Sequence, residues 1–101
     1  MIITEETKAI IEASAFISLV TIGPDENPHP IIAGKAEVAG DTVVFGIYKM
    51  EKTQRNLGLN KKAWLVAAEK DGKPRGIRLA GTAEARGKQL IFSAAQVDML
   101  L

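Results

Sequence analysis

The stretch that decides the fold is VVFGIYKMEKTQRNLGLN, which runs from Val43 to Asn60. Its first part, Val43–Tyr48, is rich in β-branched and aromatic residues, which predicts a strand. Its second part predicts a short helix from Glu51 to Leu59 that ends at Asn60. Because the strand runs almost directly into the helix, the unpaired N–H groups of the first helical turn are expected at one corner of the domain.

This corner carries residue types that favour anion binding. Lys52 and Thr53 stand in the first turn of the predicted helix, where the helix dipole and free backbone amides attract negative charge. Lysine adds a full charge, and the threonine hydroxyl adds a hydrogen-bond donor. The spacing differs from that of a nucleotide-triphosphate loop, because Glu51 rather than glycine precedes Lys52. Two interpretations stay open: a phosphate site, or a helix N-cap with a solvated lysine beside it.

Composition places the chain among globular single-domain proteins. It has 101 residues, of which 47% are hydrophobic and 25% charged, so we expect one domain spanning 1–101. It has no cysteine and a net charge of +1, which fits a reducing cytoplasm and argues against nucleic-acid binding. No apolar run reaches the roughly 18 residues of a membrane span, and the acidic start MIITEETK is not a signal peptide. A cytoplasmic protein is therefore expected.

The rest of the chain predicts mainly strands joined by short turns. A helix is expected over about residues 4–14, with Thr4 as its N-cap. Further strands are expected over 15–22, 29–38, 62–69 and 75–86. The tail reads as a short strand, Leu90–Phe92, followed by a helical turn from Ser93. Short connections favour a mainly antiparallel sheet of five or six strands, closed as a small barrel.

Side chains for acid–base, nucleophilic or metal chemistry are scarce. His29 is the only histidine, so a zinc site is improbable, and we expect His29 to pack at the start of its strand. The serines 14, 18 and 93 lie in helix or strand patterns without a nucleophile elbow. We therefore assign no catalytic residue and no metal site.

Two glycine-bearing segments are expected to lie beside the anion corner. Ile32–Lys35 and Phe45–Tyr48 belong to consecutive strands and should be antiparallel neighbours. Small residues there would let a flat ring lie close to the backbone, while the Lys52 corner holds the phosphate of that ring.

The pattern from Phe16 to Arg86 resembles the flavin mononucleotide (FMN)-binding split barrels related to pyridoxamine 5′-phosphate oxidase, above all their small flavin-binding members. The core of the match is GIYKMEKTQRN, in which Lys52-Thr53 is followed one turn later by Asn56. The resemblance implies a mainly β fold: a six-stranded antiparallel split β-barrel with an N-terminal helix and one short crossover helix. It also implies a homodimer that binds FMN at the subunit interface.

The resemblance places Lys52 and Thr53 at the phosphate, with Lys49 and Arg55 adding charge nearby. The cofactor-binding residues that it implies are Ile32, Ala33, Gly34, Lys35, Gly46, Ile47, Tyr48, Lys49, Met50, Lys52, Thr53 and Asn56. The chain departs from the family in two ways. Its segment beside the ring is apolar where small members often carry polar or aromatic residues, so ring contacts should come mostly from the backbone. It also has only QLIFSAAQVDMLL where the family usually adds a helix and a last strand.

Our leading hypothesis is a cytoplasmic FMN-binding homodimer that serves flavin-dependent redox chemistry or electron transfer. The alternative is a cofactor-free dimeric split barrel that acts as a binding or interaction module, with its apolar tail as the docking segment. A nucleic-acid-binding barrel is disfavoured by the +1 net charge and the 5% aromatic content, because such surfaces need basic grooves and stacking rings.

Overall fold

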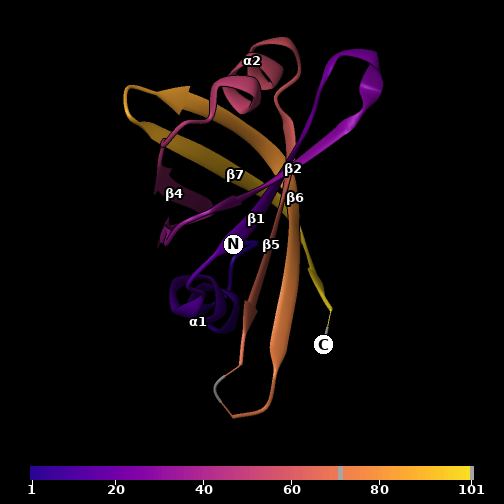
Figure 1. Ribbon diagram of the computed structural model, residues 1–101. Helices are drawn as coiled ribbons and strands as arrows, with labels where there is room; N and C mark the ends of the chain where they lie inside the picture. Colours follow the sequence, from indigo (N-terminus) through magenta and orange to yellow (C-terminus); the bar gives the residue numbers. More distant parts are fainter. Residues whose placement is uncertain (71, 101) are drawn as a thin grey trace.

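The computed structural model describes residues 1–70 and 72–100, which form seven strands in one antiparallel sheet and two α-helices (Figure 1). The elements are α1 (Glu5–Ala13), β1 (Ile17–Ile22), a 3₁₀ turn (Pro24–Glu26), β2 (Pro28–Ala33), β3 (Glu37–Ala39), β4 (Thr42–Gly46), α2 (Glu51–Leu59), β5 (Lys62–Glu69), β6 (Arg75–Arg86) and β7 (Gln89–Met99). The mainly β class and the two helices are confirmed. None of the helices in these residues is long and apolar enough to cross a membrane.

The seven strands pair in the order β2-β1-β5-β6-β7-β4-β3. β2 and β3 stand at the two ends of this order, so backbone pairing within the described residues does not close the sheet into a ring. Figure 1 shows β2 crossing in front of β1 and β5, with α2 at one end of the molecule. The β5–β6 hairpin projects at the opposite end. The sheet has seven strands, one more than the predicted six.

The predicted strand over residues 29–38 is wrong as a single element. It divides into β2, which pairs with β1, and β3, which pairs with β4 at the other edge of the sheet. Ala33 and Ala36 are both buried, and a spacing of three does not fit the two-residue alternation of a continuous strand. Gly34 weakens strand pairing at the same point.

The predicted pairing of Ile32–Lys35 with Phe45–Tyr48 is therefore wrong as well. Ile32 lies opposite Ser18 of β1, whereas Phe45 lies opposite Leu90 of β7. Strands that follow each other in sequence usually pair, and this chain is an exception because it crosses from one edge of the sheet to the other.

The tail also differs from its prediction. β7 runs unbroken from Gln89 to Met99, so no helical turn begins at Ser93. It pairs with β6 along almost its whole length, with a register shift at Ala80/Gly81. A Cβ at Gly81 would collide with the backbone carbonyl of Ser93, so the bulge requires glycine. β7 stays extended because β6 offers it hydrogen-bond partners along this length, and local sequence cannot reveal that pairing.

Several predicted elements are confirmed, because α2, β5 and β6 have the boundaries expected from sequence. The core lies on one face of the curved sheet. It contains Ile17 and Leu19 of β1, Leu65 of β5, Leu79 of β6 and Phe92 of β7. α1 packs against β5, and α2 packs against β1 and β6. These contacts fix α2 on the sheet, and its first turn follows the short segment after β4.

Candidate functional site

A pocket of about 470 Å³ lies at the start of α2. Its wall combines part of β2, the segment that follows β4, and the first turns of α2. The lining residues are His29, Ile31, Ile32, Tyr48, Lys49, Met50, Glu51, Lys52, Thr53 and Arg55. The volume falls in the range of small-molecule sites, about 300–1,000 Å³.

The first turn of α2 has no side-chain cap. Met50 occupies the N-cap position and its side chain accepts no hydrogen bond. The interpretation of Lys52 and Thr53 as a helix cap is therefore wrong, because both lie inside the helix. The free amides of this turn can donate to a ligand in the pocket, and the positive end of the helix dipole adds to their effect.

Thr53 carries an unpaired hydroxyl in the wall of this pocket. The residue is 1% exposed, and its Oγ1 is the one buried side-chain polar atom without a hydrogen-bond partner among residues 1–70 and 72–100. A buried hydroxyl without a partner costs about 1–3 kcal/mol. A ligand oxygen bound at the start of α2 would supply the missing partner.

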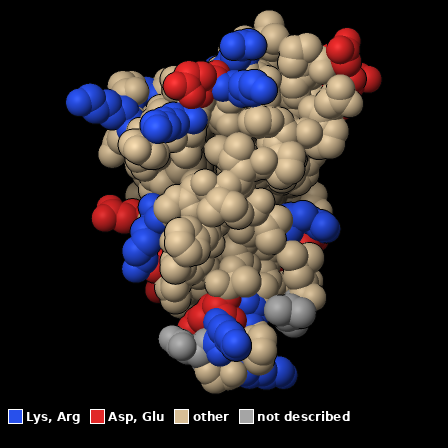
Figure 2. Space-filling model, viewed as in Figure 1, with Lys and Arg blue, Asp and Glu red and all other residues tan. Residues whose placement is uncertain are grey.

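The charged side chains of the wall are mostly cationic. Lys49, Lys52 and Arg55 line the pocket together with one carboxylate, that of Glu51, which gives a formal excess of two positive charges. None of these four side chains forms an ion pair with another described residue. Figure 2 shows acidic and basic groups side by side over this end of the molecule. The arrangement suits an anion that carries about two negative charges.

The backbone is strained immediately before α2. Lys49 has a φ of 52°, in the left-handed region that non-glycine residues seldom adopt. Its ammonium group lies 5.6 Å from the centre of the Tyr48 ring, within the range of a cation–π contact. Strain of this kind often occurs at binding sites, and here it turns the chain so that Tyr48 and Lys49 both line the pocket.

A second hollow of about 290 Å³ adjoins the first. The two share His29, Lys52 and Arg55, and the second is also lined by Asn56. Asn56 is buried, and its Nδ2 donates a hydrogen bond of 3.1 Å to Oγ1 of Thr21. Asn56 thus holds α2 against β1.

Half of the residues implied by the resemblance come together in the 470 Å³ pocket, and Asn56 borders the adjoining hollow. The five others lie elsewhere. Ala33 is buried in the core, Ile47 packs against it, and Lys35 borders a separate hollow beside Glu12. Gly34 and Gly46 are exposed. A Cβ on either glycine would meet nothing within 4 Å, so the chain itself does not require glycine there.

Sequence reasoning missed the β2 side of the pocket. His29 and Ile31 point to the same side of β2 and line the pocket, whereas His29 was expected only to pack at the strand start. Their two-residue spacing was a signal, but it became informative only once β2 was placed opposite α2. No group of three metal-binding side chains occurs in the described part of the chain.

Comparison with known proteins gives the family. The sequence profile described as Pyridoxamine 5′-phosphate oxidase matches residues 3–98. No curated protein matches the chain at a significant level.

Three solved structures are similar in fold. HupZ of Group A Streptococcus has a TM-score of 0.81 at 17% identity, over 96% of this chain and 93% of that one. An FMN-binding protein from Syntrophomonas wolfei has 0.80 at 17% identity, over 96% and 85%. A heme binding protein from Mycobacterium smegmatis has 0.77 at 17% identity, over 95% of this chain but only 52% of that one. At these identities the likeness concerns the fold, and the family rests on the profile match across nearly the whole sequence: the chain belongs to the pyridoxamine 5′-phosphate oxidase family.

Proposed function

We propose that this protein is a cytoplasmic FMN-binding flavoprotein and that the phosphate of FMN occupies the pocket at the start of α2. The observation that carries the proposal is the buried, unpaired hydroxyl of Thr53 in that pocket. Around it stand an uncapped helix start and an excess of two positive charges. A phosphate monoester carries nearly two negative charges at neutral pH and offers three acceptor oxygens, so it satisfies the hydroxyl, the amides and the cations together.

Each part of the site has a role in this proposal. Lys52 supplies a charge-assisted contact, and Thr53 donates from its hydroxyl to a phosphate oxygen. The flavin ring would lie between β2 and the segment at Tyr48, with Ile31 and Ile32 on the β2 side. Bound FMN would supply flavin-dependent redox chemistry or electron transfer, and the residues of the chain would bind the cofactor and exclude water from it.

We further propose that the protein is a homodimer. The outer face of β2 and of the segment that leads into β1 carries apolar side chains that the single chain leaves uncovered. Phe16 is 70% exposed and Ile32 is 67% exposed. Phe16 directly precedes β1 and stands two residues before Ser18, which lies directly opposite Ile32. Because side chains two residues apart in an extended chain point the same way, Phe16 and Ile32 share one face. Because Ile32 also lines the pocket, a second copy on this face would place the flavin at the interface.

The test is direct. The purified protein is examined by visible absorption spectroscopy and then titrated with FMN and, separately, with riboflavin, which lacks the phosphate. We expect saturable FMN binding that is at least tenfold tighter than riboflavin binding. A protein that carries no flavin when purified and binds neither compound would contradict the proposal and would favour a cofactor-free interaction module.

Heme is a second candidate, because His29 lines the same pocket and one protein of similar fold is described as heme-binding. Imidazole is a common axial ligand of heme iron. Addition of hemin distinguishes the two candidates. Heme function predicts a ligated Soret band that is lost in His29→Ala, whereas flavin function predicts FMN binding that this variant retains.

A further inference from the structure

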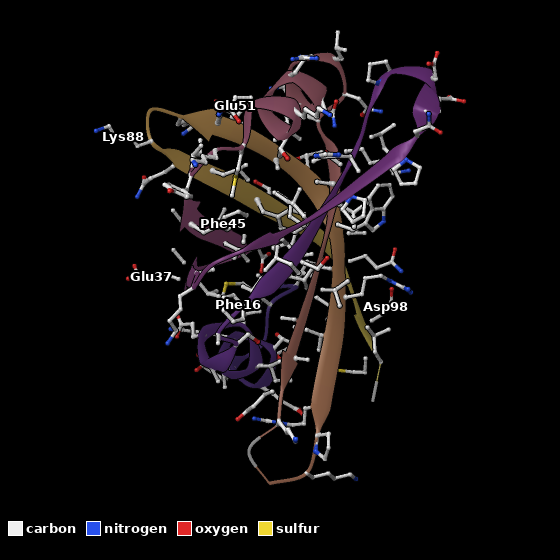
Figure 3. The ribbon with its side chains drawn as sticks, viewed as in Figure 1. Phe16, Glu37, Phe45, Glu51, Lys88 and Asp98 are labelled. Carbon is white, nitrogen blue, oxygen red and sulfur yellow. The ribbon has the colours of Figure 1, made fainter. Side chains whose placement is uncertain are left out.

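We propose that Glu51 is a specificity-determining residue that limits the negative charge the pocket accepts. The inference rests on the anion site proposed above and concerns a side chain that contributes nothing attractive to that site. Glu51 is the one acidic residue among those that line the pocket. Figure 3 shows it where the chain enters α2.

The Glu51 carboxylate has no direct partner in the described part of the chain. It forms no ion pair and no side-chain hydrogen bond with any described residue, and the residue is exposed. As the first residue of α2, it lies in the field of the free amides that would hold a bound anion. The carboxylate and the ligand therefore compete for the same positive potential.

The competition depends on the charge of the ligand. Coulomb repulsion from one carboxylate grows in proportion to the ligand charge. It is absent for riboflavin, moderate for the phosphate monoester of FMN, and larger for pyrophosphate. With Glu51 present, the charged wall carries an excess of two positive charges, which balances a phosphate monoester. A more highly charged anion would be left partly unneutralised, so Glu51 selects against nucleoside diphosphates and triphosphates.

The other helix offers a matched control. α1 also begins with acidic residues, Glu5 and Glu6, and neither lines the 470 Å³ pocket. Glu6→Gln removes one negative charge from the first turn of a helix, as Glu51→Gln does, but it does so away from the site. A general effect of net charge would appear in both variants.

The experiment measures dissociation constants of wild type, Glu51→Gln and Glu6→Gln for FMN and riboflavin by fluorescence titration. Orthophosphate and pyrophosphate are titrated by NMR on the backbone amides of Lys52 and Thr53. We expect Glu51→Gln to bind FMN about three- to tenfold more tightly at low salt, with a smaller gain at high salt. Pyrophosphate should gain more than orthophosphate. Riboflavin affinity, and all affinities of Glu6→Gln, should stay at wild-type values.

The inference is overturned if Glu51→Gln binds FMN no more tightly than wild type does, or if riboflavin gains as much as FMN. In either case, FMN binding by wild type still supports the proposed flavin function. A second outcome is that wild type binds no flavin but binds both phosphates, and that Glu51→Gln raises the affinity for pyrophosphate more than that for orthophosphate. The role of Glu51 would then stand and the flavin function would fall. If neither flavins nor phosphates bind to wild type or to Glu51→Gln, both proposals are overturned.

Discussion

Asn56 of α2 donates a hydrogen bond of 3.1 Å from its Nδ2 to Oγ1 of Thr21 in β1, and both residues are buried. This contact joins α2, whose first turns line the pocket, to a central strand of the sheet. Asn56 lies one helical turn after Thr53, so the bond also fixes where the first turn of α2 points. Stability and site geometry therefore depend on the same side chain.

We expect Asn56→Ala to lower the free energy of unfolding by about 1–3 kcal/mol, because Thr21 loses its buried partner. Urea denaturation with a two-state fit measures this change. Gln54→Ala, at an exposed position of the same helix, serves as the control and should stay within about 0.5 kcal/mol of wild type. Equal stability of Asn56→Ala and Gln54→Ala would show that the buried bond does not hold α2 in place.

Thr53→Val separates the needs of the fold from those of the ligand. Valine keeps the shape of threonine and removes the unpaired hydroxyl, so the free energy of unfolding should stay equal or rise by about 1 kcal/mol. FMN affinity should fall by about 1–3 kcal/mol, because a donor to the phosphate is lost. Thr53→Ser retains the hydroxyl and should bind FMN nearly as wild type does. A Thr53→Val protein with undiminished FMN affinity would remove the main support for the phosphate site.

Lys52→Ala tests the cation at the same corner. We expect FMN binding to weaken by about 1–3 kcal/mol, since a charge-assisted contact is lost, and riboflavin binding to change little. Isothermal titration calorimetry at low and moderate salt measures both. Lys73→Ala is the control, because Lys73 is exposed in the β5–β6 turn, at the end of the molecule opposite α2 (Figure 1). Equal losses in both variants would point to overall charge as the cause.

The sequence predicted those parts of the fold that depend on local signals. The boundaries of α2 follow from its start just after a strand and its end at Asn60, and those of β5 and β6 from strand-forming residues between turns. The break after Ala33 and the continuation of β7 beyond Ser93 depend on which distant strand offers an edge. Such long-range pairing overrides local preference.

The candidate site was likewise predicted from the sequence only in part. Its α2 side was visible in sequence because Lys52 and Thr53 stand in a recognisable first turn. Its β2 side, with His29 and Ile31, was not. β2 reaches the pocket through the curvature of the sheet rather than by pairing with β4, and no local pattern records that curvature.

Phe16→Glu tests the proposed dimer. A charge at the centre of a dry apolar interface costs more than it does in water, so we expect the variant to show half the wild-type mass by light scattering after size-exclusion chromatography. Its FMN affinity should fall as well if the second copy completes the site. Leu59→Glu changes an exposed apolar residue at the far end of α2 and should leave the mass unchanged. A wild-type protein that is already monomeric at micromolar concentration would contradict the dimer.

Asp41 links acid stability to the N-terminal segment. Its Oδ1 accepts a hydrogen bond of 2.9 Å from the backbone N–H of Ile3. This bond, with a further one from the N–H of Ile2, holds the pKa of Asp41 below its ordinary value of 3.8. Because the folded state binds the proton less readily than the unfolded state, the charged carboxylate stabilises the protein above pH 3.8, and this stabilisation is lost as the pH falls through the lowered pKa.

The corresponding variant is Asp41→Asn, whose side-chain oxygen can still accept from Ile3 but does not titrate. We expect wild type to be the more stable protein at neutral pH, and the difference in free energy of unfolding to shrink as the solution is acidified below pH 3.8. Urea denaturation of both proteins across this pH range measures the difference. A difference that stayed constant with pH would show that the folded and unfolded states bind the Asp41 proton equally, and the hydrogen bond to Ile3 would then contribute no charge-dependent stability.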